Sequence, residues 1–235
     1  MVSDWLQKSM HSWLHTQCPL CRLPLNNLAR HGICHACQIW YQPIPRCQRC
    51  GLATVVSVEQ CGQCLSTPPL WNHLYCVGDY QFPLSETIHQ LKHHRHFWQA
   101  KPLASRLSER IPTPAPVITS VPLHWKRHLV RGFNQSDLIA KQISSELNIR
   151  YEAQLFSRIR HTQTQQFLTK AQRRQNLTNA FKLNFIPETQ HIAIVDDVVT
   201  TGSTVHHLCQ LLLEVGIKRI DIYCICRTPD RKELT

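Results

Sequence analysis

Hydrophobic and polar positions beyond residue 74 follow two alternating periods. Short apolar runs bounded by polar or turn-forming residues predict β-strands, whereas apolar residues spaced three or four positions apart predict helices. The strand-like runs lie at 75–82, 117–121, 149–155, 191–195 and 218–226, and the helical spacing lies at 84–110, 133–147 and 203–215. Strands that alternate with helices are typical of a parallel sheet covered on both faces, so we predict an α/β fold.

Two features interrupt this alternation. Pro102 lies inside the helical segment 84–110, and we expect it to bend or split that helix because proline lacks a backbone N–H. The segment 157–180 is polar, basic and weakly periodic. So long a polar stretch in a compact domain is usually a functional loop, and we interpret it as one.

Eight of the 12 cysteines form four Cys-X-X-Cys pairs near the N-terminus. Two cysteines at this spacing can bind one metal ion from a tight turn, and a second pair completes the tetrahedral thiolate set that structural zinc prefers. We therefore predict about two zinc ions, bound by Cys18, Cys21, Cys34, Cys37, Cys47, Cys50, Cys61 and Cys64. Sequential and interleaved combinations of the four pairs both fit the spacing. Few apolar residues separate the pairs, so metal binding should supply much of the folding free energy here.

The chain thus divides into three predicted parts. An N-terminal helix or arm occupies 1–17, a double zinc-ribbon-like module occupies 18–66, and the α/β domain occupies 75–235. The other four cysteines belong to no such pair and fall in predicted strands or on an apolar helix face, where we expect them to be buried. They are Cys76, Cys209, Cys224 and Cys226.

Composition points to a folded protein of a reducing compartment. Hydrophobic residues make up 43% of the chain and charged residues 17%, which argues against disorder. No apolar run approaches the roughly 20 residues that cross a bilayer, and the N-terminus lacks the apolar core of a secretory signal. We therefore expect a cytoplasmic protein without a transmembrane segment, in which cysteines bind metal rather than form disulfides.

The net charge of +11 is unevenly distributed. Residues 1–74 carry five basic and two acidic side chains, whereas the remainder carries 21 and 13. The surplus is concentrated at 85–131 and 158–174. It suggests a phosphate-bearing partner, either a small molecule or a nucleic acid, although basic surfaces without such a role are also common.

The most specific motif spans 191–204. An apolar strand, Ile192 to Val195, is followed by Asp196 and Asp197 and then by a hydroxyl-rich turn with one glycine that opens a helix. Carboxylates at the carboxyl end of a strand can accept hydrogen bonds from ribose hydroxyls, and a turn at the positive end of a helix can bind a phosphate. Helix capping alone would not require two carboxylates directly after a fully apolar strand. The motif resembles the phosphoribosyl pyrophosphate (PRPP) loop of type I phosphoribosyltransferases.

Two more segments extend the resemblance to nearly the whole chain. Residues 121–136 include the sequence RGFNQ at 131–135, and residues 158–181 carry a pattern of Arg, Thr, Gln, Leu and Asn side chains. The RGFNQ stretch could serve equally in helix structure or in facing a substrate. Lys92 and Arg95 match a basic family pattern whose glycine is missing here. Together with the cysteine pairs, these motifs resemble the ComF family of competence-associated proteins, which includes GntX-like proteins.

The resemblance implies a fold and a set of site residues. The fold is a type I phosphoribosyltransferase-like parallel sheet with helices on both faces, preceded by a small zinc-ribbon-like module with four-cysteine metal sites. Asp196 and Asp197 would hold the ribose hydroxyls, and Arg127 would face the pyrophosphate. The 5-phosphate would lie against Thr200, Thr201, Gly202, Ser203 and Thr204. Magnesium on the pyrophosphate is implied wherever PRPP binds.

The same resemblance implies a protein of natural transformation that handles incoming single-stranded DNA in the cytoplasm. Other DNA-uptake proteins at the inner membrane are implied as further partners. The candidate DNA-binding residues are Arg158, Arg160, Arg173 and Arg174. These arginines are also suited to solvating a mobile loop or to contacting PRPP. Aromatic residues beside basic ones either stack on bases or belong to the core, and they are Trp98, Trp125, Phe133 and Phe167.

A phosphoribosyltransferase of nucleotide metabolism is the alternative. Such an enzyme would transfer ribose 5-phosphate from PRPP to a nitrogen acceptor, mostly by positioning and electrostatic stabilisation. The sequence contains no recognisable acceptor-base pocket, and it assigns no catalytic residue.

Overall fold

The computed structural model describes residues 17–25, 32–93, 96–123, 132–159 and 180–229. The chain divides into two compact units, Met1–Gln42 and Pro43–Thr235. The first unit contains the short 3-10 helix η1 (Ala36–Tyr41) and an isolated antiparallel bridge between Gln17 and Pro24. The second contains the sheet and also the second pair of Cys-X-X-Cys motifs. The domain boundaries expected from the sequence stay a prediction.

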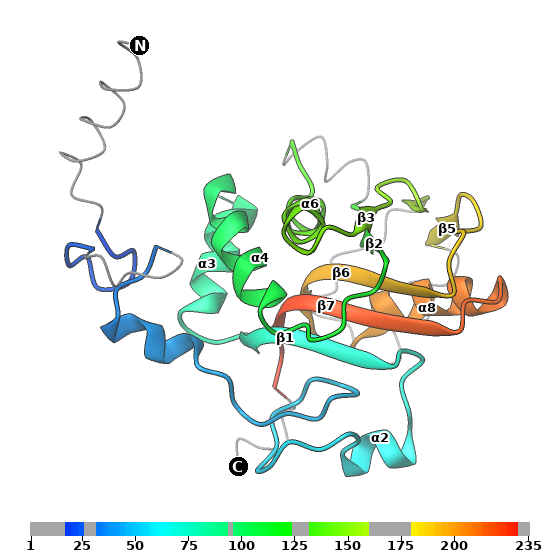
Figure 1. Ribbon diagram of the computed structural model, residues 1–235, viewed down its shortest axis with the longest axis horizontal. Coiled ribbons are helices and arrows are strands. Elements are labelled where there is room, and N and C mark those ends of the chain that lie inside the picture. The colour runs from blue at the N-terminus through cyan, green and yellow to red at the C-terminus, as the bar shows by residue number, and fades with distance from the viewer. Residues whose placement is uncertain (1–16, 26–31, 94–95, 124–131, 160–179, 230–235) are drawn as a thin grey trace. The chain divides into compact units, whose positions relative to one another are not determined.

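Five parallel strands form the central sheet of the second unit (Figure 1). Their order is β1 (His73–Asp79), β7 (Arg219–Arg227), β6 (His191–Val199), β2 (Val117–Ser120) and β3 (Arg150–Tyr151). Strands β6 and β7 are mostly apolar and are buried along most of their length because both of their faces are covered. The parallel α/β sheet predicted from the sequence is confirmed.

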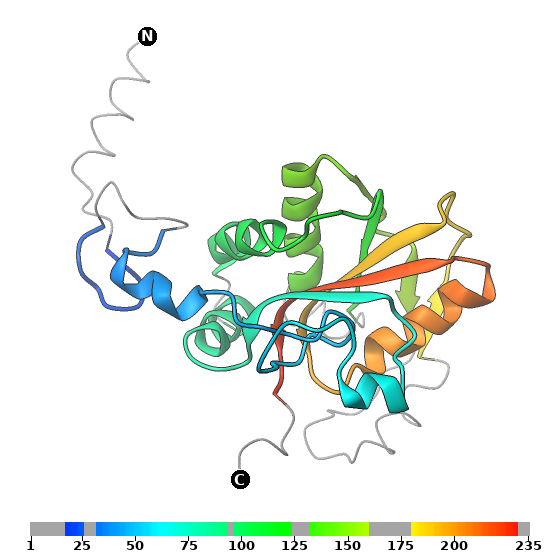
Figure 2. The same ribbon diagram turned by 60° about the horizontal axis from the view of Figure 1, so that its bottom comes forward.

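Helices cover both faces of this sheet. Figures 1 and 2 show α4 (Ala100–Ser108) and α6 (Gln135–Leu147) on one face and α8 (Ser203–Glu214) on the other. Helix α8 buries Val205, Leu208 and Leu212 against Ile192 and Ile194 of β6. The chain leaves β2 toward α6 and leaves the adjacent β6 toward α8. This reversal between neighbouring strands is where open α/β sheets bind ligands.

The segment 84–110 is split, but not at its proline. Helix α3 (Leu84–His93) is followed by the 3-10 helix η2 (Phe97–Gln99) and then by α4. Pro102 is the third residue of α4, in the first turn, where a missing N–H interrupts no helical hydrogen bond. The break therefore precedes Pro102, and the proline helps to begin a helix instead of bending one.

The second half of the domain also departs from the expected pattern. Strand β3 contains two residues rather than the seven predicted at 149–155. Strands β4 (Phe156–Arg158) and β5 (Phe181–Leu183) pair antiparallel at the two ends of the polar segment predicted as a loop. Residues 160–179 of that loop lie outside the described residues. Among the helices that the structure describes, none is long and apolar enough to cross a membrane.

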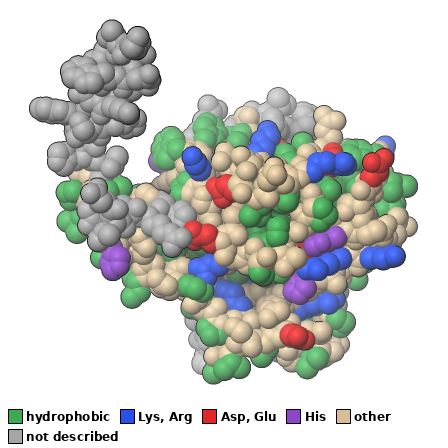
Figure 3. Space-filling view, in the orientation of Figure 1, with side chains coloured by type: hydrophobic (Ala, Val, Ile, Leu, Met, Phe, Trp, Pro, Cys, Tyr) green, Lys and Arg blue, Asp and Glu red, His purple; other side chains and the backbone are tan. Residues whose placement is uncertain are grey.

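A buried carboxylate joins the amino-terminal ends of three strands. Asp221 of β7 is fully buried, and its Oδ1 and Oδ2 lie 3.2 Å from His73 Nδ1 and 2.7 Å from His191 Nε2. Arg219 Nη2 lies 3.4 Å from Oδ2. Figure 3 shows histidine and basic side chains gathered on the surface at this end of the sheet. These contacts fix the starts of β1, β6 and β7 relative to one another. Asp196 and Asp197 lie toward the opposite, carboxyl-terminal end of the strands.

Candidate functional site

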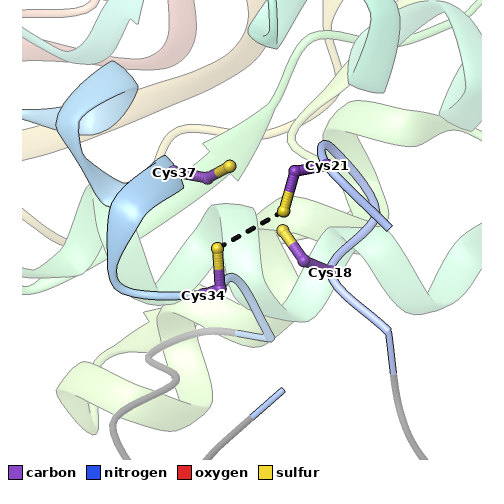
Figure 4. Close-up of side chains that lie close together, drawn as sticks. All are labelled: Cys18, Cys21, Cys34 and Cys37. Atoms are coloured by element: carbon purple, nitrogen blue, oxygen red, sulfur yellow. Dashed lines mark hydrogen bonds between the residues drawn. The ribbon is translucent and has the colours of Figure 1, made fainter. Parts of the chain in front are cut away.

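The first cysteine cluster lies in the unit Met1–Gln42. The Sγ atoms of Cys18, Cys21, Cys34 and Cys37 point toward one another and lie within 4.8 Å (Figure 4). The Sγ atoms of Cys21 and Cys34 are 3.6 Å apart. Thiolates around a tetrahedral zinc ion, with Zn–S bonds of about 2.3 Å, would be separated by about 3.8 Å. The spacing of these four sulfur atoms therefore fits a metal ion of this kind.

The second cluster lies in the unit that contains the sheet. Cys47, Cys50, Cys61 and Cys64 bring their Sγ atoms within 4.8 Å. The Cys50–Cys61 and Cys47–Cys64 sulfur distances are 3.7 and 3.9 Å. Cys64 lies on the short helix α2 (Gly62–Ser66). The sequence left sequential and interleaved combinations of the Cys-X-X-Cys pairs open. The structure shows the sequential combination: the first two pairs form one cluster and the last two pairs form the other.

Backbone amides favour the thiolate form at one cysteine of each cluster, whereas burial raises the pKa of Cys37, Cys50 and Cys64. Burial opposes ionisation of Cys18, yet N–H groups of Cys21, Cys34 and Leu20 lower the pKa of its thiol to about 6. In the second cluster the pKa of Cys47 is also lowered despite burial, and the N–H of Cys61 lies 3.2 Å from its sulfur. Four thiolates with no open position are the donor set of structural zinc, so both clusters fit this ion.

The remaining cysteines confirm the expectation of burial. All 12 cysteines are free of disulfide bonds. Cys76, Cys209, Cys224 and Cys226 are at most 7% exposed and contribute to the strands and helix of the domain.

Asp196 and Asp197 lie next to each other on β6 but face different surroundings. Successive strand residues point to opposite faces, and accordingly only Asp196 lines a pocket with the turn that follows the strand. The Oδ1 atom of Asp196 accepts hydrogen bonds from the Asp197 N–H at 2.9 Å and from Ser136 Oγ at 3.2 Å. Burial and the Asp197 carboxylate raise the pKa of Asp196 to about 7, although Lys92 and these hydrogen bonds act in the opposite direction.

Asp197 is paired with a lysine from another element. Its Oδ2 atom lies 2.9 Å from Nζ of Lys92 on α3, and its side chain is only 6% exposed. Burial opposes the charge of Lys92, but the carboxylates of Asp197 and Asp196 outweigh it and raise the pKa of the ammonium. The lysine therefore stays charged and balances part of the negative charge at the end of β6.

The hydroxyl-rich turn connects β6 to α8. Thr200, Thr201, Gly202, Ser203 and Thr204 line one pocket together with Asp196. Thr201 Oγ1 lies 2.8 Å from Ser203 Oγ, so the turn is braced by its own hydroxyls. Gly202 precedes the first helical residue with φ +74°, and a Cβ there would lie 2.8 Å from the ring of Trp71. The glycine is required by this backbone conformation and by the packing of Trp71.

The RGFNQ segment has a structural role where the structure describes it. Asn134 caps α6, since its side chain accepts from Ser136 N–H at 3.1 Å and donates to Val121 O at 3.0 Å. Phe133 is buried and packs edge-on against Phe97. Ser136, which follows the motif, contacts Asp196. The described part of the segment thus has the structural role considered for it, and the residue that contacts Asp196 is the one that follows the segment.

Several predicted site residues lie outside the described residues. They are Arg127, Arg160, Arg173 and Arg174, with Trp125 and Phe167 among the aromatic candidates. Arg158 is described: it lies on β4, with its guanidinium 5.3 Å from the ring centre of Phe181. Sequence reasoning did not identify the partners of the motif. Lys92 was noted only as a match to a family pattern and Ser136 only as the last residue of the segment 121–136, and Trp71 carried no signal of its own.

Comparisons with known proteins agree with this geometry. Residues 135–235 match the model of the phosphoribosyl transferase domain family. The chain is 42% identical over 221 residues to the DNA utilization protein YhgH of Escherichia coli (strain K12), which covers 90% of this chain and 96% of the relative. It is 35% identical over 231 residues to Competence protein F of Haemophilus influenzae, covering 93% and 100%. Competence protein ComFC of Bacillus subtilis is 24% identical over 202 residues, covering 85% and 72%.

We expect purified protein to contain about two zinc ions per chain, one for each set of four thiolates. Cys64→Ser should reduce the content to about one, because each tetrahedral site needs all of its ligands. Mass spectrometry for metals, combined with thiol titration, measures both quantities. Cys209→Ser is the matched control, since that cysteine is buried outside both clusters. Metal-free protein with disulfide-bonded cysteines would contradict the prediction.

Proposed function

The chain belongs to the ComF/YhgH family of competence and DNA-utilization proteins, and from this premise we propose that it handles single-stranded DNA and binds PRPP at the carboxyl end of β6. The observation that carries the proposal is the pocket at 196–205. It combines a carboxylate, a hydroxyl-rich turn and the amino terminus of a 12-residue helix. This combination suits a ribose that carries a 5-phosphate, because hydroxyls donate to carboxylates and phosphates bind at helix amino termini.

Each group in the pocket has a part in this proposal. Asp196, which lines the pocket, accepts from the ribose hydroxyls, and Asp197 keeps Lys92 charged beside it. The turn at 200–204 and the first N–H groups of α8 bind the 5-phosphate. Arg127 is proposed to face the pyrophosphate. Magnesium bound to PRPP would neutralise part of the pyrophosphate charge. Magnesium prefers carboxylate oxygen ligands, and in this pocket Asp196 would provide one.

A working phosphoribosyltransferase is the second candidate, and the same pocket favours it. Release of pyrophosphate from PRPP, followed with a panel of nucleobases and with ammonia, separates the two. Sustained turnover with one acceptor would establish transfer. Binding of PRPP without turnover would support a protein that uses the site as a ligand pocket during DNA handling.

Replacing both Asp196 and Asp197 with Asn should weaken PRPP binding by about 2–4 kcal/mol. Hydrogen bonds from the ribose hydroxyls to the charged Asp196 contribute about 1.5–3 kcal/mol each and overlap, and the change at Asp197 removes the partner of Lys92. Calorimetric titration with PRPP and magnesium measures the change. Glu214→Gln, at the far end of α8, is the control and should bind as the unmodified protein does. An unchanged affinity in the double variant would place the site elsewhere.

The affinity for PRPP should increase between pH 6 and pH 8. Asp196 has a pKa of about 7, so it is mostly protonated at the lower pH and ionised at the higher, and only the ionised form accepts two hydroxyl donors and attracts magnesium. A group with this pKa changes the affinity by about tenfold over that range. PRPP itself titrates, so the measured quantity is the difference between the protein and Asp196→Asn. If the affinity of the protein and that of Asp196→Asn change with pH in the same way, the titrating group belongs to PRPP and the prediction is wrong.

DNA handling is proposed from the relatives and from the charge. The family members compared above are named for DNA utilization and competence, and the chain carries a net charge of +11. Arg158, Arg160, Arg173 and Arg174 are proposed to contact the phosphates of a single strand. Trp98 supports the presence of a stacking surface, because its side chain is 67% exposed and its ring is stacked with His96.

Replacing these four arginines with Gln should weaken binding of single-stranded DNA and flatten its salt dependence. The slope of log K against log salt decreases by about 0.7 for each phosphate contact that is lost. A filter-binding titration across salt concentrations measures affinity and slope together, and the zinc content should not change. Lys218→Gln, which removes an exposed cation at the other end of the sheet, is the control and should leave affinity and slope unchanged. Wild-type slope and affinity in the quadruple variant would exclude this segment as the DNA site.

A further inference from the structure

Two side chains connect the second cysteine cluster to the hydroxyl-rich turn. The segment Cys47–Cys50 lies beside β1: Leu74 N–H donates to Gln48 O at 2.9 Å, and a Cβ on Gly51 would lie 2.3 Å from the Leu74 side chain. Segment and sheet are therefore in close contact within one compact unit. From that segment, two backbone carbonyls accept hydrogen bonds from residues that also contact the turn.

Arg227 makes the first connection. It is the last residue of β7. Its Nε donates to Cys50 O at 3.0 Å, and its Nη1 donates to Val199 O at 3.1 Å and to Thr200 O. The same nitrogen lies 3.0 Å from Thr228 O. One planar guanidinium thus joins the carbonyl of a cysteine in the cluster to the last residue of β6 and the first residue of the turn.

Trp71 makes the second connection. Its indole Nε1 donates to Arg49 O at 2.7 Å, and a Cβ on Gly202 would lie 2.8 Å from its ring. The side chain is 6% exposed and belongs to the core between the sheet and α8. The indole therefore supports the turn at Gly202, while Arg227 holds its first residue.

We propose that the second cysteine cluster, when it holds its metal, positions the end of β6 and the start of the hydroxyl-rich turn, residues 199–202, through Arg227 and Trp71. Four thiolates around one ion fix the backbone of residues 47–50, and that backbone presents the Arg49 and Cys50 carbonyls to the two side chains. Arg227 and Trp71 are positioning residues, since neither lines the pocket at 196–205. The expected effect on PRPP affinity rests on the proposed function. The coupling between the cluster and the turn does not depend on it.

The guanidinium geometry makes the coupling testable without disturbing the metal. Arg227→Lys keeps the positive charge but removes the planar fork that reaches carbonyls in two directions at once. Arg219→Lys is the matched control: the same substitution, on the same strand, at the end where the contacts are to Asp221 and His73. Trp71→Phe removes the indole N–H and keeps an aromatic ring beside Gly202.

The first measurement is amide hydrogen exchange in peptides covering residues 199–206. We expect exchange there to accelerate by about tenfold or more in Arg227→Lys and in Trp71→Phe, because each loses a hydrogen bond to the segment that supports the turn. Exchange at 139–147 in α6 should stay the same and serves as the internal control. Cys64→Ser, which loses the metal, should accelerate exchange at 199–206 as well. Arg219→Lys should not.

The second measurement is PRPP affinity, by calorimetry with magnesium, in the same variants. We expect a decrease of about tenfold in Arg227→Lys, with two equivalents of zinc retained, and no change in Arg219→Lys. Wild-type exchange at 199–206 in Cys64→Ser, or in both Arg227→Lys and Trp71→Phe, would overturn the coupling. A wild-type protein that does not bind PRPP would instead overturn the proposed function, and the exchange measurement would still decide the coupling.

Discussion

Asp196 and Asp197 place two carboxylates at adjacent positions in the carboxyl-terminal half of β6, after four residues that are fully buried. Two neighbouring negative charges in such surroundings repel each other and lose most of their hydration. The ammonium of Lys92, 2.9 Å from Asp197, makes this arrangement possible. Because the lysine balances one carboxylate, the other remains available to the pocket, with a pKa near neutrality. The division of labour between two chemically identical residues follows from strand alternation and from the position of one cation.

The sheet and the motif could be predicted from the sequence because both depend on short-range pattern. Alternating periods were enough to predict parallel strands and covering helices, and four cysteine pairs were enough to predict two clusters. The carboxylates and hydroxyls at 196–204 are contiguous, so their proximity needed no tertiary information. The pairing of cysteine motifs did need it, since sequential and interleaved sets have the same spacing, and only the folded backbone distinguishes them.

What the sequence did not predict depends on contacts between distant elements. Lys92 precedes its partner Asp197 by more than one hundred residues, and nothing near Lys92 indicates an ion pair. In the sequence, Trp71 and Arg227 look like an ordinary core aromatic and an ordinary strand-end cation. Pro102 was misjudged for a local reason: a proline in a helical pattern signals a first turn as readily as a bend, and the choice depended on where the preceding helix ends.

The second cluster has too few apolar side chains to support anything by packing alone. Its buried group consists of Cys47, Cys50, Leu52 and Cys64, with Val58 and Cys61 partly buried against it. A metal ion bound by the four thiolates would therefore supply much of the rigidity of this segment. The backbone N–H of Cys61 is directed at the Cys47 sulfur, whereas the Arg49 and Cys50 carbonyls accept hydrogen bonds from Trp71 and Arg227. Those carbonyls need donors from elsewhere in the fold, and an indole and a guanidinium that also touch the turn provide them. Under the proposed coupling, the cluster with its metal is part of the scaffold of the neighbouring site.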